Sequence, residues 1–141
     1  MVQRSAQAEW QGKLEGGRGT MKLGSGAFEG SYSYQTRFGE APGTNPEELI
    51  AAAHAGCFSM ALAAELGQAG FMPERIHTKA SVTLEKSGGG FAITRIALDT
   101  EAHIPDIDER LFQEHADSAK RNCPVSRALA GTTITLNARL I

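Results

Sequence analysis

The feature of this sequence that most constrains its fold is a long apolar run near the middle of the chain, residues 49–66. From Leu49 to Ala64 it contains 16 consecutive residues without a charge. Helix-start signals precede the run: Asn45 is a capping residue type, Pro46 suits the first turn, and Glu47 and Glu48 complement the helix dipole. A helix without a polar face must be enclosed by other structure. We therefore expect a helix that lies at the centre of the fold.

Both ends of this helix carry further signals. Thr44 and Glu47 have the spacing of a capping box, and Gly67 and Gly70 indicate where the helix stops. One small domain has difficulty enclosing such a helix on all sides. Two copies packed together in a dimer, with sheets outside, would bury both helices, and we take this as a hypothesis.

The flanking segments predict strands and two further helices. Strands are expected where apolar residues alternate or glycines mark turns, at residues 7–13, 18–22, 30–35, 76–86, 91–103 and about 134–140. Helices are expected after Asp108 and from Pro124, at residues 109–121 and 124–130. Strands at both ends, helices between them and no regular βαβ repeat indicate an α+β fold. The length of 141 residues fits a single domain spanning residues 1–141.

The composition excludes several classes of function. Hydrophobic residues make up 41% and charged residues 21%, which is ordinary for a folded domain. The net charge is −2 without a basic block, so nothing would attract nucleic acid or an anionic membrane. The uncharged run is shorter than a membrane span, and the polar N-terminus lacks the apolar segment of a signal peptide. We expect a cytoplasmic protein without nucleic-acid or membrane partners.

The two cysteines are the candidate reactive groups. Cys57 lies within the apolar helix, where a cysteine is more often a small buried hydrophobe than a nucleophile. Cys123 precedes Pro124 at a helix N-terminus, where amide dipoles stabilise a thiolate, so structural and functional roles are evenly balanced there. A permanent disulfide is not expected in the cytosol, whereas a transient catalytic one remains open. The spacing along the chain does not tell whether the two sulfurs meet.

A thiolate inside an apolar helix needs a nearby cation, because burial alone raises the pKa of a thiol. Arg37 and Arg18 are the candidates, since a guanidinium stays charged and binds in a fork. Glu47 or Glu48 could hold the arginine, although helix capping explains either carboxylate equally well. In a straight helix Glu47 lies about 15 Å from Cys57 along the axis and about 80° around it. A site that uses both is therefore more easily completed across a dimer interface.

Several segments of the chain resemble one known family. The longest is the helix motif TNPEELIAAAHAGCFSMAL at residues 44–62, and the others are Gly70-Phe71, GFAIT at residues 90–94 and CPVS at residues 123–126. These paired cysteine motifs resemble the osmotically inducible protein C (OsmC) family over nearly the whole chain. His54 before Cys57, and Val125 after the proline, are similar to the OsmC branch rather than to the organic hydroperoxide resistance (Ohr) branch.

The resemblance implies both a fold and an activity. The implied fold has antiparallel sheets wrapped around central helices in an intertwined homodimer. The implied activity is that of a two-cysteine peroxidase in oxidative and osmotic stress defence, which reduces organic hydroperoxides, and hydrogen peroxide more weakly. An external dithiol of lipoyl type, or a small thiol, would regenerate the enzyme, and neither a metal nor a bound organic cofactor is implied.

Carried over by position, the resemblance assigns roles to four residues. Cys57 corresponds to the peroxidatic cysteine and Cys123 to the resolving cysteine. Glu47 corresponds to the family's carboxylate, and Arg37 to the arginine of the OsmC branch. Arg18 is the alternative, because it matches the place where Ohr-like members carry theirs.

Other residues of the chain bear on packing and on access. Gly56 stands where the family has alanine, which predicts looser packing in the helix without altered chemistry. An apolar entrance would favour bulky organic peroxides. Four side chains could line such an entrance, although core packing is the commoner role for each: Phe38, Phe58, Met60 and Phe71.

Two other functions remain open at this point. His54 and Cys57 lie on one helical face, and with Cys123 and one further histidine (His77, His103 or His115) they could form a four-ligand metal site. Such spacings are frequent by chance, and the chain has no second motif of this kind. Alternatively, the protein is a structural dimer whose thiols carry no chemistry.

Overall fold

The computed structural model describes all residues from Met1 to Ile141. The chain forms two compact units, residues 1–49 and residues 50–141. The expectation of a single domain over residues 1–141 stays a prediction.

The first unit contains a three-stranded antiparallel sheet. Its strands are β1 (Ala6–Gln11), β2 (Arg18–Leu23) and β3 (Glu29–Tyr32), paired in the order β1-β2-β3. Most side chains of this sheet are exposed on both faces, and on β1 only Trp10 is partly covered, by an aromatic contact with Tyr32. An isolated sheet with so little buried surface is marginally stable in water, so this unit requires further packing.

One expectation for this unit is wrong. The strand predicted at residues 30–35 ends at Tyr32, and the chain turns into a short helix, α1 (Tyr34–Phe38). The cause is a capping box, in which the Ser33 hydroxyl accepts the N–H of Thr36 and the Thr36 hydroxyl accepts the N–H of Ser33.

Helix α2 (Pro46–Gln68) confirms the expectation from the apolar run. Its first turn is capped by Asn45, whose side-chain oxygen accepts the N–H of Glu48 at 2.8 Å. The predicted capping box between Thr44 and Glu47 is not formed, because the Glu47 carboxylate binds Arg37 instead.

The second unit is built on a mixed sheet in the order β4-β5-β6. Strands β4 (Arg75–Ser87) and β5 (Gly90–His103) form the expected hairpin, with a bulge between Thr83 and Leu84. Strand β6 (Thr133–Leu140) runs parallel to β5, which differs from the antiparallel sheets expected. The difference arises because α3 (Glu109–Asn122) and α4 (Pro124–Ala128) form the crossover between the two strands.

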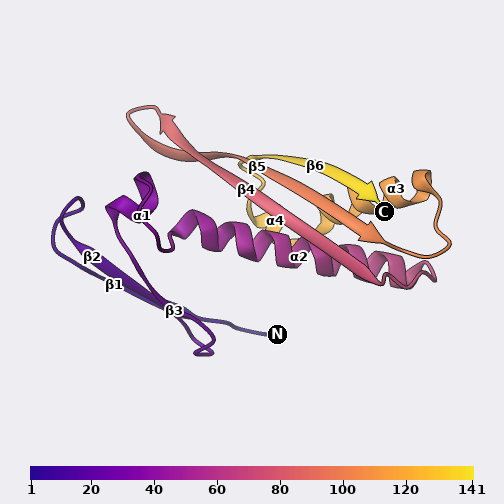
Figure 1. The fold of residues 1–141 in the computed structure, drawn as a ribbon, viewed down its shortest axis with the longest axis horizontal. Coiled ribbons are helices and arrows are strands. Elements are labelled where there is room, and N and C mark those ends of the chain that lie inside the picture. Colours follow the sequence, from indigo (N-terminus) through magenta and orange to yellow (C-terminus); the bar gives the residue numbers. More distant parts are fainter. The chain divides into compact units, whose positions relative to one another are not determined.

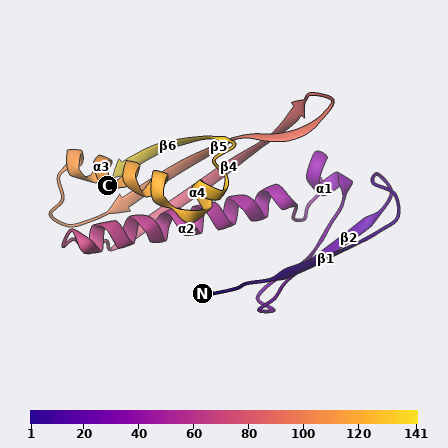
Figure 2. The same ribbon diagram turned by 180° about the vertical axis from the view of Figure 1, so that it is seen from behind.

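Three helices cover one face of this sheet. Figures 1 and 2 show α2, α3 and α4 on the same side of β4, β5 and β6. The core between these layers consists of fully or almost fully buried apolar side chains: Phe58, Leu62, Leu66, Ile96, Leu98, Ala102, Ile104, Phe112, Ala116 and Ala119. The other face of the sheet is polar and carries ion pairs, among them Arg139 with Asp99 and Arg75 with Glu101. The apolar residues of each strand therefore determine which face of the sheet the helices cover.

Helix α3 ends where the site begins. Asp108 caps its start, as expected, by accepting the N–H of Leu111. At the other end Pro124 cannot continue the hydrogen-bond ladder of α3, so Cys123 is both the C-cap of α3 and the N-cap of α4.

One face of α2 is not covered by the sheet and helices of the second unit. The buried residues His54, Phe58, Leu62 and Leu66 lie four positions apart and face the core. Between Leu49 and Gly67 the exposed residues are small or apolar and lie on a different face: Ala52, Ala53, Gly56, Met60, Ala64 and Gly67. By length and composition alone α2 could cross a membrane, but a core helix of a soluble protein has the same properties.

Candidate active site

The two cysteines meet in the second unit. Cys57 lies on α2 and Cys123 lies at the corner between α3 and α4, and their sulfur atoms are 2.8 Å apart. A disulfide bond is about 2.05 Å long, so these are two free thiols in contact. The two thiols share a hydrogen bond. The cysteine pair therefore needs only a small movement to close into a disulfide.

The two thiols differ in their access to solvent. Cys123 is 0% exposed, because it is enclosed at the corner between the helices. Cys57 is partly exposed. Only Cys57 can therefore meet a molecule that arrives from outside.

The two thiols also differ in acidity. Burial, and then the hydrogen bond with Cys123, raise the pKa of Cys57, while the backbone N–H of Val125 opposes this shift. Burial also acts to raise the pKa of Cys123, but hydrogen bonds from Cys57, from the Ser126 backbone and hydroxyl, and from Val125 outweigh it, so that its pKa is lowered. These surroundings favour the thiolate on Cys123, and Cys57 needs a cation that they do not provide.

A buried polar pair adjoins the cysteines. His54 is 0% exposed on α2, and its Nε2 lies 2.7 Å from the hydroxyl oxygen of Ser126 on α4. Burial lowers the pKa of His54, so its imidazole is neutral. The other ring nitrogen, Nδ1, is buried without a hydrogen-bond partner.

The first unit brings Arg37 and Glu47 together. The guanidinium binds the carboxylate in a fork, with Nε 2.8 Å from Oε1 and Nη2 3.0 Å from Oε2. Only 10% of the Glu47 side chain is exposed, and the hydrogen bond with Glu47 raises the pKa of Arg37. The guanidinium is therefore charged and fixed in direction, and about a third of its side chain is left exposed.

Arg18, the alternative arginine, has no such partner. It is exposed on β2, and no carboxylate lies within ion-pairing distance of it. Of the two candidates, Arg37 alone is held in position.

A cavity of about 400 Å³ lies next to Arg37 within the first unit. Aromatic and apolar side chains dominate its wall, and the lining residues are Trp10, Gly12, Leu14, Tyr32, Ser33, Tyr34 and Arg37. No local sequence pattern predicted this cavity, because its wall is assembled from β1, β3, α1 and the loop after β1.

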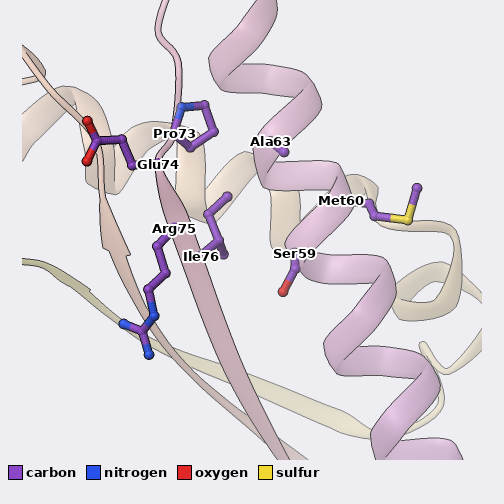
Figure 3. A pocket seen from close by; sticks show the side chains of 7 residues that line it. All are labelled: Ser59, Met60, Ala63, Pro73, Glu74, Arg75 and Ile76. Carbon is purple, nitrogen blue, oxygen red and sulfur yellow. The ribbon is translucent and has the colours of Figure 1, made fainter.

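A second cavity, of about 280 Å³, lies between α2 and the start of β4 (Figure 3). Its walls include Ser59, Met60 and Ile76, and neither cysteine lines it. Of the four side chains considered for an entrance, Met60 is exposed here, whereas Phe58 is fully buried in the core and cannot line one. Phe58 therefore has the core-packing role that the sequence analysis gives as the commoner one.

The ligand set of the metal alternative is not assembled. No group of three or more histidine, cysteine, aspartate or glutamate side chains could hold an ion. His54 binds Ser126, and His103 and His115 lie beside Glu74 and Glu65 respectively.

The fold and this geometry define an α+β protein with a dithiol centre, in which one thiol is reachable and the other is enclosed. The profile of the OsmC-like protein family matches residues 39–137. The chain is 48% identical over 140 residues to "Peroxiredoxin OsmC" of Escherichia coli K12, which covers 99% of this chain and 97% of that protein. The protein belongs to the OsmC family, as the cysteine motifs indicated.

Two further comparisons agree with this assignment. The chain is 35% identical over 98 residues to the "Organic hydroperoxide resistance protein" of Xanthomonas axonopodis pv. citri, covering 67% of each chain. A solved OsmC-like protein of unknown function from Vibrio cholerae superposes with a TM-score of 0.78 over 98% of this chain and 99% of its own. At 16% identity, this second likeness concerns the fold alone.

Two residues of the site were not assigned a role from the sequence. His54 was considered only as a metal ligand and as a mark of the OsmC branch, and Ser126 only as part of the CPVS motif. A signal for both exists: a histidine stands in an otherwise apolar helix three positions before Cys57, and Ser126 stands three positions after Cys123.

Cys57 is the more exposed thiol, whereas only Cys123 has a lowered pKa. Alkylation can tell which of these two properties decides the cysteine that reacts first. We expect iodoacetamide to modify Cys57 first in the folded, reduced protein, because Cys123 is fully enclosed. Peptide mass spectrometry after short labelling times measures the order, and labelling in denaturant, where both thiols react, is the control. Earlier labelling of Cys123 would contradict the assigned burial.

Proposed function

We propose that this protein reduces organic hydroperoxides, with Cys57 as the peroxidatic and Cys123 as the resolving cysteine. It is an enzyme of the peroxidase class, which the 48% identity to a peroxiredoxin over almost the full length supports. The observation that carries the mechanism is the 2.8 Å contact between the two sulfurs. No observation favours the structural-dimer alternative.

The first step takes place at the exposed sulfur. The Cys57 thiolate attacks the outer oxygen of the hydroperoxide, the O–O bond breaks, and the alkoxide that leaves takes up a proton to become an alcohol. Cys57 is thereby oxidised to a sulfenic acid. Cys57 carries this step because it is the thiol that a substrate can reach.

The second step uses the enclosed sulfur. Cys123 attacks the sulfenic sulfur of Cys57, an S–S bond forms, and hydroxide leaves and is protonated to water. An external dithiol, of lipoyl type or from a small-thiol pool, then reduces the disulfide by exchange and restores both thiols. We propose that the cycle runs in the cytoplasm without a metal or a bound organic cofactor.

Arg37 supplies the cation that Cys57 needs. Burial raises the pKa of Cys57, and a charged guanidinium offsets that cost. Glu47 fixes the direction of Arg37 through the two-bonded fork. A preference for organic hydroperoxides over hydrogen peroxide would require an apolar surface that buries their hydrocarbon part.

The active protein is an intertwined homodimer in which residues 1–141 act as one domain. The uncovered apolar face of α2 and the thinly covered first sheet each lack a packing partner within their own unit. A second copy would cover both surfaces. Nothing lies within 4 Å of a Cβ added at Gly56, so this glycine leaves room for a close helix–helix approach.

The cysteine variants test the division of roles. We expect Cys57→Ser to abolish turnover, because the only reachable thiol is lost. We expect Cys123→Ser to retain one oxidation event and to accumulate the Cys57 sulfenic acid. Trapping with dimedone, followed by mass spectrometry, measures the sulfenic acid. Steady-state turnover of Cys57→Ser at the wild-type rate would overturn the assignment of the nucleophile.

The arginine variants test which cation activates Cys57. We expect Arg37→Lys to lower kcat/KM for cumene hydroperoxide about 100-fold, because an ammonium cannot form the fork with Glu47. Arg18→Lys is the matched control and should have little effect. Stopped-flow oxidation kinetics measure both variants, and the reverse ranking would transfer the role to Arg18.

A charge on the exposed face of α2 tests the dimer. Gly56→Asp does not clash within its own chain and does not weaken the isolated helix. It would nevertheless bury a carboxylate between two copies. We expect it to convert the dimer into a monomer in analytical ultracentrifugation. Ser87→Asp in the exposed β4–β5 turn is the control, and a Gly56→Asp variant that remains dimeric would exclude α2 as the interface.

A further inference from the structure

A buried polar contact lies next to the cysteine pair on one side. His54 stands on α2 three positions before Cys57, which is about one helical turn. Its Nε2 lies 2.7 Å from the hydroxyl oxygen of Ser126, three positions after Cys123 on α4. His54 is 0% exposed and Ser126 is 5% exposed, so water does not compete for this bond. The contact therefore joins the same two segments of the chain as the sulfurs do.

A second polar contact lies on the other side of the cysteines. Glu65 is the only charged residue of α2 beyond its first turn, and it stands eight positions after Cys57. Its carboxylate accepts the hydroxyl of Ser118 on α3 at 2.5 Å, and its other oxygen lies 3.4 Å from Nδ1 of His115. Both partners precede Cys123 on α3, by five and eight positions. This contact too joins α2 to the segment that carries the enclosed thiol.

The order of these contacts is reversed between the two partners, so α2 runs antiparallel to the α3–α4 segment. His54 and Glu65 lie about 16 Å apart along the axis of α2, and the sulfurs meet between them at 2.8 Å. A single contact would allow the two segments to pivot about it, whereas a contact on each side fixes their register. Apolar packing is non-directional, so the core alone fixes this register less closely.

The buried histidine is not the residue that packs most stably at its position. Its Nδ1 is buried without a hydrogen-bond partner, and an unpaired buried polar atom costs free energy. A leucine would fill a similar volume without that unpaired nitrogen. What His54 adds is a directional bond to Ser126 beside the cysteines. A role in position rather than in stability accounts for it.

We infer that His54 and Glu65 are positioning residues, which through their bonds to α4 and α3 hold the enclosed sulfur against Cys57 for the resolving step. The inference rests on the proposed function, in which Cys123 resolves the sulfenic acid of Cys57. Neither residue needs to touch the hydroperoxide. Because the sulfurs are already in contact, the disulfide closes without unfolding of either helix.

This arrangement protects Cys57 from a second oxidation. In the resolving step the Cys123 sulfur gives its electron pair to the sulfenic sulfur, the S–O bond breaks, and the thiol proton leaves with the hydroxide as water. An unresolved sulfenic acid instead attacks a second hydroperoxide, whose O–O bond breaks, and a sulfinic acid and an alcohol form. Resolution takes place within the chain, whereas the second oxidation needs another molecule, so a held Cys123 reacts first.

Disulfide closure can be measured apart from the first oxidation. Rapid mixing with one equivalent of cumene hydroperoxide, acid quench and mass spectrometry separate sulfenic acid from disulfide. We expect His54→Leu and Glu65→Leu each to slow closure about tenfold, without slowing formation of the sulfenic acid. In excess hydroperoxide both variants should accumulate sulfinic acid on Cys57 faster than the wild type. Closure at the wild-type rate in either variant would overturn the inference for that residue.

Two control variants separate positioning from a general loss of packing. Glu65→Gln keeps an oxygen that accepts the Ser118 hydroxyl, so it should close at the wild-type rate. Ser59 also lies on α2, but its hydroxyl binds Thr78 on β4 at 2.8 Å and not α3 or α4. Ser59→Ala should therefore leave closure unchanged. If Ser59→Ala slowed closure as much as Glu65→Leu, the effect would be general to α2 and the inference would be overturned.

A second readout does not depend on hydroperoxide. Equilibration with reduced and oxidised glutathione measures how strongly the fold favours the Cys57–Cys123 disulfide. We expect His54→Leu and Glu65→Leu to weaken this preference about tenfold, which corresponds to a reduction potential about 30 mV higher. An unchanged potential in both variants would overturn the inference, even if the wild-type protein reduces hydroperoxides. A wild-type protein that reduces no hydroperoxide, while the variants still shift this potential, would instead overturn the proposed function and support the positioning roles.

Discussion

The contact between the sulfurs of Cys57 and Cys123 is the constraint on which the proposed chemistry of this protein depends. It exists because α2 and α3 share one apolar core, in which Phe58 and Leu62 pack with Phe112 and Ala119. Pro124 then forces the chain to end α3 and restart as α4, and this corner places Cys123 beside Cys57. If the core packing were lost, the two sulfurs would move apart although both cysteines were still present.

The two cysteines differ in two properties, the exposure of the thiol to solvent and its pKa. Cys57 is reachable but its surroundings raise its pKa, whereas Cys123 is enclosed and its pKa is lowered. This division suits a two-step reaction, because the enclosed thiol is out of reach of a substrate but in contact with Cys57. The proposed role of Arg37 follows from the same division, since the pKa of Cys57 is raised and a charged guanidinium held in direction by Glu47 would offset that cost.

The sequence predicted those elements whose position depends on a single local signal, such as an apolar run, a capping residue or a proline. The apolar run predicted α2, Asp108 predicted the start of α3, and Pro124 predicted α4. The cysteine motifs indicated the OsmC family. Local rules failed where a residue had two possible partners. Glu47 has capping-box spacing but binds Arg37, and residues 34–35 read as strand but enter a helix capped by Ser33. The contact of His54 with Ser126 joins helices distant in sequence, so no periodicity could reveal it.

The most direct measurement of the central claim is the mass of the oxidised protein. Fully reduced wild-type protein is treated with one equivalent of cumene hydroperoxide, digested without reductant and analysed by mass spectrometry. The geometry predicts that the chain loses two hydrogen atoms and that one cross-linked peptide pair joins Cys57 to Cys123 within a single chain. Two intact thiols after consumption of the peroxide, or a disulfide only between chains, would contradict it.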